Sequence, residues 1–386
     1  MVAFFGGGTM PGLISRAAVA VGAAAVLLGP AVVAVSSGGT AGASVVPGRN
    51  GKIVVGQVFP NFGFTINPNG SRRHRIGPPG STTCTGWSPN GRKVLCNVWG
   101  QHHVQPATAN PDGSDFHLLN PARRLDLFCL SWSPTGRRLL CHSEGLRNPA
   151  RAGLYSIRAA DGRGLVRITA SPSGFFDNAY GYSPNGSRVL FARFGPHDHG
   201  VLFSARSNGT GRIRLSPPRL SVIDLGFFDR IGADWSPDGS RAAFAAFNPS
   251  TNRTGLFVVN ADGTELRRVT PSRLGAISAQ WSPRGNFVTF TSCCTRIQVF
   301  VVNVNGGHLR QLTFTANRAE SFTPVWSPDG QKILFQREFF HGQTPTGGAL
   351  YTIKRNGADL FRVTKLPTRV FAQGGAFFYS WGTARP

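Results

Sequence analysis

Few residues of this chain have types and spacings that could support chemistry, and the cysteines are the most regular of them. Six are present, at Cys84, Cys96, Cys129, Cys141, Cys293 and Cys294. An even number is what an oxidising compartment favours, because each thiol can then find a partner. The sequence contains no Gly-x-Ser-x-Gly nucleophile elbow, so nucleophilic catalysis has little support.

Two histidine segments could suggest a metal site. In His197-Asp198-His199, alternate residues of a strand would point to one face, so two imidazoles could meet one ion. Pro196 and Gly200 flank the segment, which favours a solvated loop between two strands. The same interpretation applies to His102-His103. We therefore expect no metal site, no cofactor and no catalytic residue.

The elements that position these residues come from an internal repeat. The string Trp-Ser-Pro-x-Gly begins at Trp87, Trp132, Trp235, Trp281 and Trp326, a copy with tyrosine begins at Tyr182, and residues 47–51 form a degraded seventh copy. A tight-turn pair, Asn-Gly or Asp-Gly, recurs in phase at Asn69, Asp112, Asp161, Asn208, Asp262, Asn305 and Asn356. The two markers therefore give the same count of seven.

Each repeat carries four short strand signals. The first ends at the tryptophan, the second is apolar, the third reads Leu-aromatic-x-aliphatic, and the fourth is rich in arginine. Successive aromatic residues are 45, 50, 53, 46 and 45 residues apart, which is the length of a propeller blade. The sequence predicts an all-β, seven-bladed β-propeller of four-stranded antiparallel blades, with six or eight blades as alternatives.

The two ends of the chain predict how the ring closes. The N-terminal unit has second, third and fourth strands over residues 53–76 but lacks a first strand. The C-terminus supplies an extra first strand at residues 377–381. We expect this strand to join the N-terminal blade, because that removes the open edge of a split ring. Residues 44–386 then form one propeller domain.

The repeat resembles a known family. Residues 326–335, Trp-Ser-Pro-Asp-Gly-Gln-Lys-Ile-Leu-Phe, match the WD40-like PD40 repeat of TolB-type β-propellers almost letter for letter. The resemblance covers essentially the whole chain after residue 43 and departs at Tyr182 and before Trp87. It implies an extracytoplasmic setting and protein partners. It is weak evidence for an activity, because one scaffold hosts many functions.

Aligning the repeats on their aromatic residue pairs four of the cysteines. Cys96 and Cys141 stand nine residues after the aromatic, where four other repeats have phenylalanine, and the same two repeats carry Cys84 and Cys129 three residues before it. These positions face each other across the hairpin, where opposed Cβ atoms lie about 4.5–5.5 Å apart. We predict the disulfides Cys84–Cys96 and Cys129–Cys141, with buried free thiols as the alternative.

The repeat does not settle the remaining cysteines or the acidic turn residues in the same way. For Cys293 and Cys294, a vicinal disulfide, a link to an external partner and a reduced pair all stay open. Asp238 and Asp329 occupy a turn position that holds Asn, Thr or Arg in other copies. That variation favours turn support over catalysis.

The first 43 residues resemble an export signal. Arg16 precedes an apolar run over residues 17–35, and Ala41-Gly42-Ala43 is a small-x-small cleavage pattern. We predict cleavage after Ala43. An uncleaved membrane anchor is the alternative, because 19 apolar residues nearly span a bilayer.

The charge of the chain favours an anionic partner. Lys and Arg number 41 against 17 Asp and Glu, a formal net charge of +24, which suits a phospholipid surface or a cell-wall polyanion. Export and the absence of a dedicated motif argue against nucleic acid. The alternative is structural, because many arginines lie on fourth strands, where charge discourages edge-to-edge aggregation.

Two aromatic-acidic segments precede first strands and could form a contact rim. They are Phe175-Phe176-Asp177 and Phe227-Phe228-Asp229. We predict a secreted or periplasmic cell-envelope scaffold, monomeric and non-catalytic, that binds a protein or an anionic envelope component. One alternative is a propeller enzyme of lactonase, lyase or glycosidase type with its site in the central channel, which the scarcity of acidic residues disfavours. The other is a carbohydrate- or cell-wall-binding module.

Overall fold

The computed structural model describes most of the chain after the predicted export segment. The described residues are 46–58, 61–100, 103–119, 125–145, 148–195, 199–223, 232–292, 296–315, 318–342, 344–368 and 376–384. Residues 1–43, the candidates at 197–198 and 227–229, His102, Cys293 and Cys294 lie outside these ranges. No helix within the described residues is long and apolar enough to cross a membrane.

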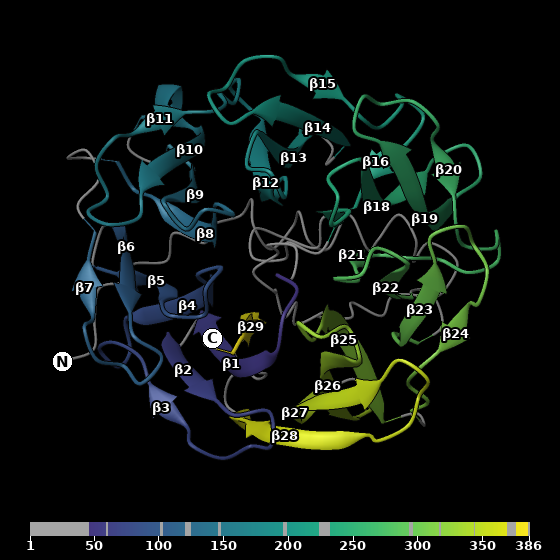
Figure 1. The fold of residues 1–386 in the computed structure, drawn as a ribbon. Coiled ribbons are helices and arrows are strands. Elements are labelled where there is room, and N and C mark those ends of the chain that lie inside the picture. The colour runs from purple at the N-terminus through teal and green to yellow at the C-terminus, as the bar shows by residue number, and fades with distance from the viewer. Residues whose placement is uncertain are drawn as a thin grey trace.

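The architecture is all-β, and its sheets stand around a common centre (Figure 1). Five sheets have four antiparallel strands each. Four of them take their strands consecutively, and three of these are β4–β7 (Thr82–Trp87, Val94–Trp99, Val104–Ala109, His117–Leu118), β8–β11 (Phe128–Trp132, Arg138–Ser143, Gly153–Arg158, Val166–Arg167) and β21–β24 (Gln280–Trp281, Phe287–Thr291, Val299–Asn303, Arg310–Gln311). A fourth consists of β25–β28 (Ala319–Trp326, Lys332–His341, Thr344–Lys354, Phe361–Leu366). A single-turn 3-10 helix, η1 (Pro149–Arg151), precedes β10.

The sixth sheet has nine strands and holds two of the expected units. Its halves are β12–β15 (Phe176–Tyr182, Arg188–Phe194, Gly200–Arg206, Ile213–Arg214) and β17–β20 (Ala233–Trp235, Arg241–Asn248, Arg253–Asn260, Arg267–Arg268). The short strand β16 (Ser221–Val222) pairs with β14 on one side and β18 on the other. The repeat did not predict this bridge, because β16 lies in the long spacer between two copies.

The remaining four-stranded sheet combines the two ends of the chain. Its order is β29 (Ala376–Thr383), β1 (Asn50–Val58), β2 (Phe62–Ile66) and β3 (His74–Arg75). Ile53 lies opposite Trp381 and Val55 opposite Tyr379, which is the pairing that the missing first strand predicts. The Tyr379 hydroxyl also donates to the carbonyl of Thr323 on β25 at 2.7 Å, so β29 is tied to the preceding sheet as well.

The Ser-Pro-x-Gly turns form the first structural signature of the repeat. In six copies the serine Oγ accepts a hydrogen bond from the backbone N–H five residues later, at 2.8–3.1 Å. The glycine takes φ between 65° and 80°, which disfavours other residues. A Cβ on five of these glycines would lie 3.3–3.8 Å from the proline Cδ of the preceding turn. The turns therefore stack on one another from sheet to sheet.

The buried tryptophans connect neighbouring sheets through hydrogen bonds. Trp235, Trp281 and Trp326 are almost completely buried. The backbone N–H of Trp281 donates to the carboxylate of Asp234 at 2.9 Å, and that of Trp326 donates to the amide oxygen of Gln280 at 2.7 Å. Each acceptor directly precedes the tryptophan of the previous sheet. A buried donor left unsatisfied costs stability, so these polar residues link sheets that otherwise pack through apolar surface.

Candidate functional site

The residues considered for metal chemistry do not gather in the part of the chain that the structure describes. His103 and His199 are both exposed. Within the described ranges, no group of three or more His, Cys, Asp or Glu side chains could hold a metal ion.

The four repeat-aligned cysteines form two disulfides in the structure, Cys84–Cys96 and Cys129–Cys141. Each bond joins directly opposed residues of the first two strands of a sheet, and each lies beside a register shift in that pairing. All four side chains are fully buried. The sheets that carry them, β4–β7 and β8–β11, are neighbours in the chain.

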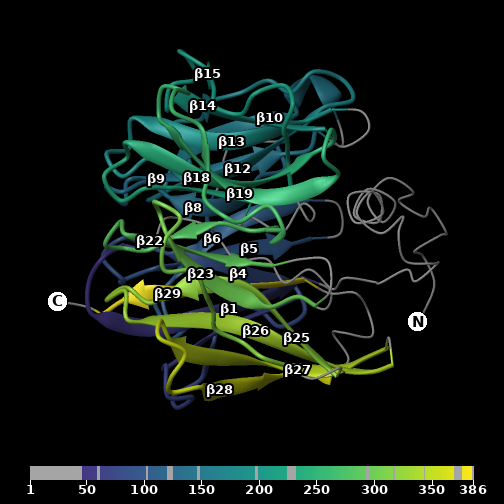
Figure 2. The same cartoon turned by 90° about the vertical axis from the view of Figure 1, so that its right-hand side faces the viewer.

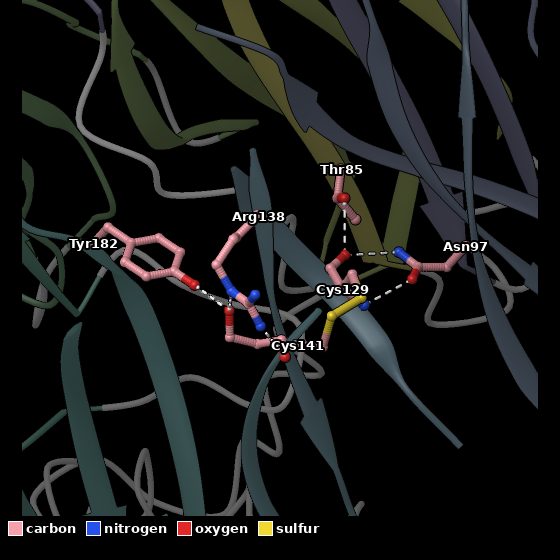
Figure 3. Close-up of a disulfide and its surroundings, with 7 residues drawn as sticks. Thr85, Asn97, Cys129, Arg138, Cys141 and Tyr182 are labelled. Carbon is pink, nitrogen blue, oxygen red and sulfur yellow. Dashed lines mark hydrogen bonds between the residues drawn. A yellow bond between two sulfur atoms is a disulfide. The ribbon is translucent and has the colours of Figure 1, made fainter. Parts of the chain in front are cut away.

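Asn97 connects these two sheets at the second disulfide (Figure 3). Its amide oxygen accepts from the Cys129 N–H at 2.7 Å, and its amide nitrogen donates to the Cys129 carbonyl at 2.9 Å. The Thr85 hydroxyl donates to the same carbonyl at 3.1 Å. On β10, the hydroxyl oxygen of Ser156 accepts hydrogen bonds from the Arg138 guanidinium and from the Tyr182 hydroxyl. The tyrosine that replaces tryptophan in one repeat is thus used as a hydrogen-bond donor.

One of the two expected contact segments can be placed. Phe175 is 38% exposed, whereas Phe176 stacks on Phe194 with ring centroids 4.9 Å apart. The Asp177 side chain is fully buried and forms a two-pronged ion pair with Arg193, at 2.6 and 2.7 Å. Asp177 therefore serves the fold in this structure, and of the three residues only Phe175 is exposed.

The acidic turn residues support their turns. The Asp238 carboxylate accepts from the Ser236 hydroxyl at 2.6 Å and from the Ser240 N–H at 3.0 Å. Burial alone would raise the pKa of Asp238, but these hydrogen bonds outweigh it and lower the pKa. Asp329 accepts in the same way from Ser327 and also from Asn50, at 2.9 Å.

Several arginines bind backbone carbonyls of their own or a neighbouring sheet. Arg138 and Arg188 each donate to a serine of the third strand and to two carbonyls. Arg267 and Arg310 donate to carbonyls in the Asn-Gly turn region of the next sheet, at residues 304–305 and 356. Carbonyl bonds leave the positive charge unneutralised. These arginines can therefore support the fold and still give the protein a positively charged surface.

A positively lined hollow lies between the β21–β24 and β25–β28 sheets, on the side of the turns. It consists of two adjoining depressions of about 320 and 330 Å³, which share Phe287, Arg355 and Asn356. We call them together the basic groove. Arg284 and Lys354 line the first depression, and His308 and Arg310 line the second. No aspartate or glutamate lines either one.

Residues of the two sheets contact each other within the groove. The Arg355 guanidinium lies over the Phe287 ring, 4.3 Å from its centroid, and Arg310 donates to the Asn356 carbonyl at 3.0 Å. Lys354 is paired with Asp359 at 2.6 Å. Such a cleft focuses positive potential and suits an anionic ligand. From the sequence alone only the total charge could be inferred, because this set of residues combines a Ser-Pro-x-Gly turn with an Asn-Gly turn of the next repeat.

Comparison with known proteins agrees with the repeat. Residues 229–344 match the family model of the TolB beta propeller domain, PD40. A search of curated proteins found no match.

Solved structures show the same fold at low sequence identity. TolB from Acinetobacter baumannii is 15% identical, over 86% of this chain and 82% of that one, with a TM-score of 0.51. An oligogalacturonate lyase in complex with manganese is 14% identical, over 83% and 86%, with a TM-score of 0.55. The β-propeller domain of the trilobed protease from Pyrococcus furiosus is 12% identical, over 84% and 98%, with a TM-score of 0.57.

These likenesses concern the fold, and the proteins concerned include both a TolB and enzymes. The repeat, the sheets and the family match agree with one another. Residues 229–344 are therefore similar to the TolB beta propeller domain, PD40, and the described sheets have the all-β fold of propeller proteins.

Proposed function

We propose that the protein is an exported, non-catalytic scaffold of the cell envelope that binds an anionic envelope component in the basic groove. The observation that carries the proposal is a paired hollow lined by Arg284, Arg310 and Arg355, with no acidic residue in its lining; Lys354 also lines it but is paired with Asp359. The surrounding chain has a large excess of basic residues. Long-range attraction from that excess would raise the local concentration of a polyanion, and the groove would then provide specific contacts.

The export and architecture of the protein belong to the same proposal. Residues 1–43 direct the chain out of the cytoplasm, and the remainder folds as one monomeric seven-bladed ring. The nine-stranded sheet counts as two blades joined by β16, and the β1–β29 pairing closes the ring. Two buried disulfides support an oxidising setting, which is secreted or periplasmic.

The groove is tested with a probe of defined chemistry. Binding of fluorescently labelled poly(glycerol phosphate) is measured by anisotropy, and binding to phosphatidylglycerol vesicles is measured by co-sedimentation. We expect Arg284→Glu/Arg355→Glu to weaken binding about tenfold or more at moderate salt, because two cations are replaced by anions in one cleft. The two probes distinguish a wall polymer from a lipid surface as the source of phosphate.

The matched control is Arg75→Glu/Arg212→Glu, which makes the same change in net charge on exposed residues that do not line the groove. It should keep most of the binding. Equal loss in both variants would show that total charge alone attracts the probe, and no binding by the wild type to either probe would refute the proposal.

A further inference from the structure

One outer edge of the propeller differs from all the others that the structure describes. In six of the seven four-stranded units, the fourth strand is only two residues long: β3, β7, β11, β15, β20 and β24. The fourth strand of the last unit, β28, has six residues, Phe361–Leu366. Very short edge strands are one usual way to prevent unwanted strand pairing. β28 is longer, and it has instead a register shift against β27, the charged side chains of Arg362 and Lys365, and one close neighbour, since a Cβ on Gly70 would lie 2.5 Å from the Val363 carbonyl oxygen.

The length of β28 comes from an extended ladder with its inner neighbour. β27 and β26 are the longest strands described, with 11 and 10 residues. β28 pairs with β27 from Thr352↔Phe361 to Gly348↔Leu366. Among the described residues no strand pairs with its other side, and it lies on the outer circumference of the molecule (Figure 1). In the side view it runs along the margin of the molecule (Figure 2).

The side chains of this edge indicate the chemistry of an occupant. Leu360 and Phe361 are 49% and 44% exposed, and Arg362 and Lys365 are also exposed. The strand itself contains no acidic residue. An added strand that alternates apolar and acidic side chains would therefore match it in both shape and charge.

A second copy of this chain is a poorer occupant. In the full-length antiparallel register about a twofold axis, Phe361 would face Leu366 of the second copy, and Arg362 would face Lys365. Like charges directly opposite each other destabilise a pair of strands. A partner with carboxylates at those positions would replace that repulsion with attraction.

We propose that β28 is a docking edge for an extended acidic peptide segment of a partner protein, which adds to the β25–β28 sheet as an antiparallel or parallel fifth strand. Main-chain hydrogen bonds to the outer side of β28 would supply affinity, while Arg362 and Lys365 would select carboxylates. This site is separate from the basic groove, because the groove is lined by the turn at residues 354–356 and not by β28.

The test uses the mature chain and a fluorescein-labelled octapeptide of alternating valine and glutamate. We expect saturable binding, visible as a rise in anisotropy, and slower hydrogen exchange of amides within residues 361–366. Arg362→Glu/Lys365→Glu should weaken binding at least tenfold, and a valine–lysine octapeptide should bind this variant better than the wild type. Alternate N-methylation of the valine–glutamate peptide should abolish binding, since it removes the donors that pair with an edge strand.

Two further variants separate the outcomes. Arg75→Glu/Arg212→Glu carries the same charge change elsewhere, and Arg284→Glu/Arg355→Glu alters the basic groove; both should bind the peptide within about twofold of the wild type. Equal binding of the N-methylated peptide, an equal loss with Arg75→Glu/Arg212→Glu, or no binding by the wild type would overturn the proposal. Loss only in the groove variant would place the peptide in the groove and would likewise overturn it.

Discussion

The two disulfide-bearing sheets and the four units that follow them fill the same position of the repeat in different ways. In the later units, a buried second-strand aromatic stacks on an aromatic of the third strand, with centroids 5.4–5.9 Å apart: Phe191 on Phe203, Phe244 on Phe257, Phe290 on Phe300 and Phe335 on Tyr351. In β4–β7 and β8–β11 the position is a half-cystine. The aromatic pairs stabilise the fold by burying apolar area. The disulfides stabilise it chiefly by restricting the unfolded chain.

The location of the disulfides suggests why the difference exists. The sheet of Cys84 adjoins β1 and β2, where the chain ends pair, and the fit there is close. A Cβ on Gly63 would lie 2.5 Å from the Cys84 Sγ, and one on Gly56 would lie 2.0 Å from the Cys84 carbonyl oxygen. The compact bond thus lies against a tightly packed neighbour strand. The Cys84–Cys96 disulfide therefore lies next to the described sheet that combines the two ends of the chain.

The largest effect is expected from removing a stacked aromatic. Phe244 is fully buried, so Phe244→Ala should lower the free energy of unfolding by about 3–5 kcal/mol through lost burial and a cavity. Urea denaturation followed by tryptophan fluorescence measures it. Phe314→Ala, at a side chain that is 77% exposed, should stay within about 0.5 kcal/mol. A cost below about 1 kcal/mol for Phe244→Ala would contradict the role given to stacking.

The next largest effect tests whether the two solutions are interchangeable. Each cysteine pair can be replaced with the residues that the β12–β15 unit has at the same two positions, Ala179 and Phe191. At the first pair, Cys84→Ala/Cys96→Phe should lower the free energy of unfolding by about 3 kcal/mol, because the cross-link is lost. Cys96 lies opposite Ala107, whereas Cys141 lies opposite Tyr155.

At the second pair, Cys129→Ala/Cys141→Phe should therefore cost about 1 kcal/mol less, because the new ring can stack on Tyr155. Both unfolding free energies are compared with that of the wild type, whose disulfides are verified by mass mapping of non-reduced peptides. Free thiols in the wild type, or equal costs at the two pairs, would contradict this comparison.

A smaller effect concerns the polar link between the disulfide sheets. Asn97→Ala removes the two hydrogen bonds that the Asn97 amide forms with the buried N–H and C=O of Cys129. This variant should lower the free energy of unfolding by about 1–3 kcal/mol. Asn110→Ala, in an exposed turn, is the control and should cost far less. Thermal and urea denaturation both report the difference, and similar costs in the two variants would refute a special role for Asn97.

The smallest effect is a dependence on pH in the β10–β11 turn. Hydrogen bonds from Arg158, and then from the Arg163 N–H, lower the pKa of Asp161 to about 2 from its ordinary value of 3.8. The stabilisation is therefore complete above about pH 4 and is lost as the pH falls through about 2. The corresponding turn of the next unit has Asn208, which does not titrate. In Asp161→Asn, the loss of unfolding free energy between pH 5 and pH 2 should be smaller than in the wild type. Urea denaturation at several pH values measures it, and the same pH dependence in both proteins would contradict the prediction.

Much of the fold could be predicted from particular residues. The Trp-Ser-Pro-x-Gly copies predict where first strands end, because serine closes the turn and glycine takes the positive φ that it needs. The alignment of Cys84 with Cys96 depends only on hairpin register, which is local. The unusual acceptors Asp234 and Gln280 stand out in the sequence as polar residues directly before a tryptophan, but their partners lie 46–47 residues away, and local pattern does not reveal them.

The candidate sites depend on the third dimension to a greater extent. The basic groove joins Arg284 to Arg355, residues of two sheets that meet only when whole sheets pack together. The exposed edge at β28 exists because β27 extends its ladder, although the repeat gives all fourth strands a similar signal. The sequence by itself determined the unit, its turns and its cysteine pairs, because those follow from interactions within a hairpin. Only the tertiary structure decided which charges converge and which edge stays unpaired, because both depend on how complete sheets pack against one another.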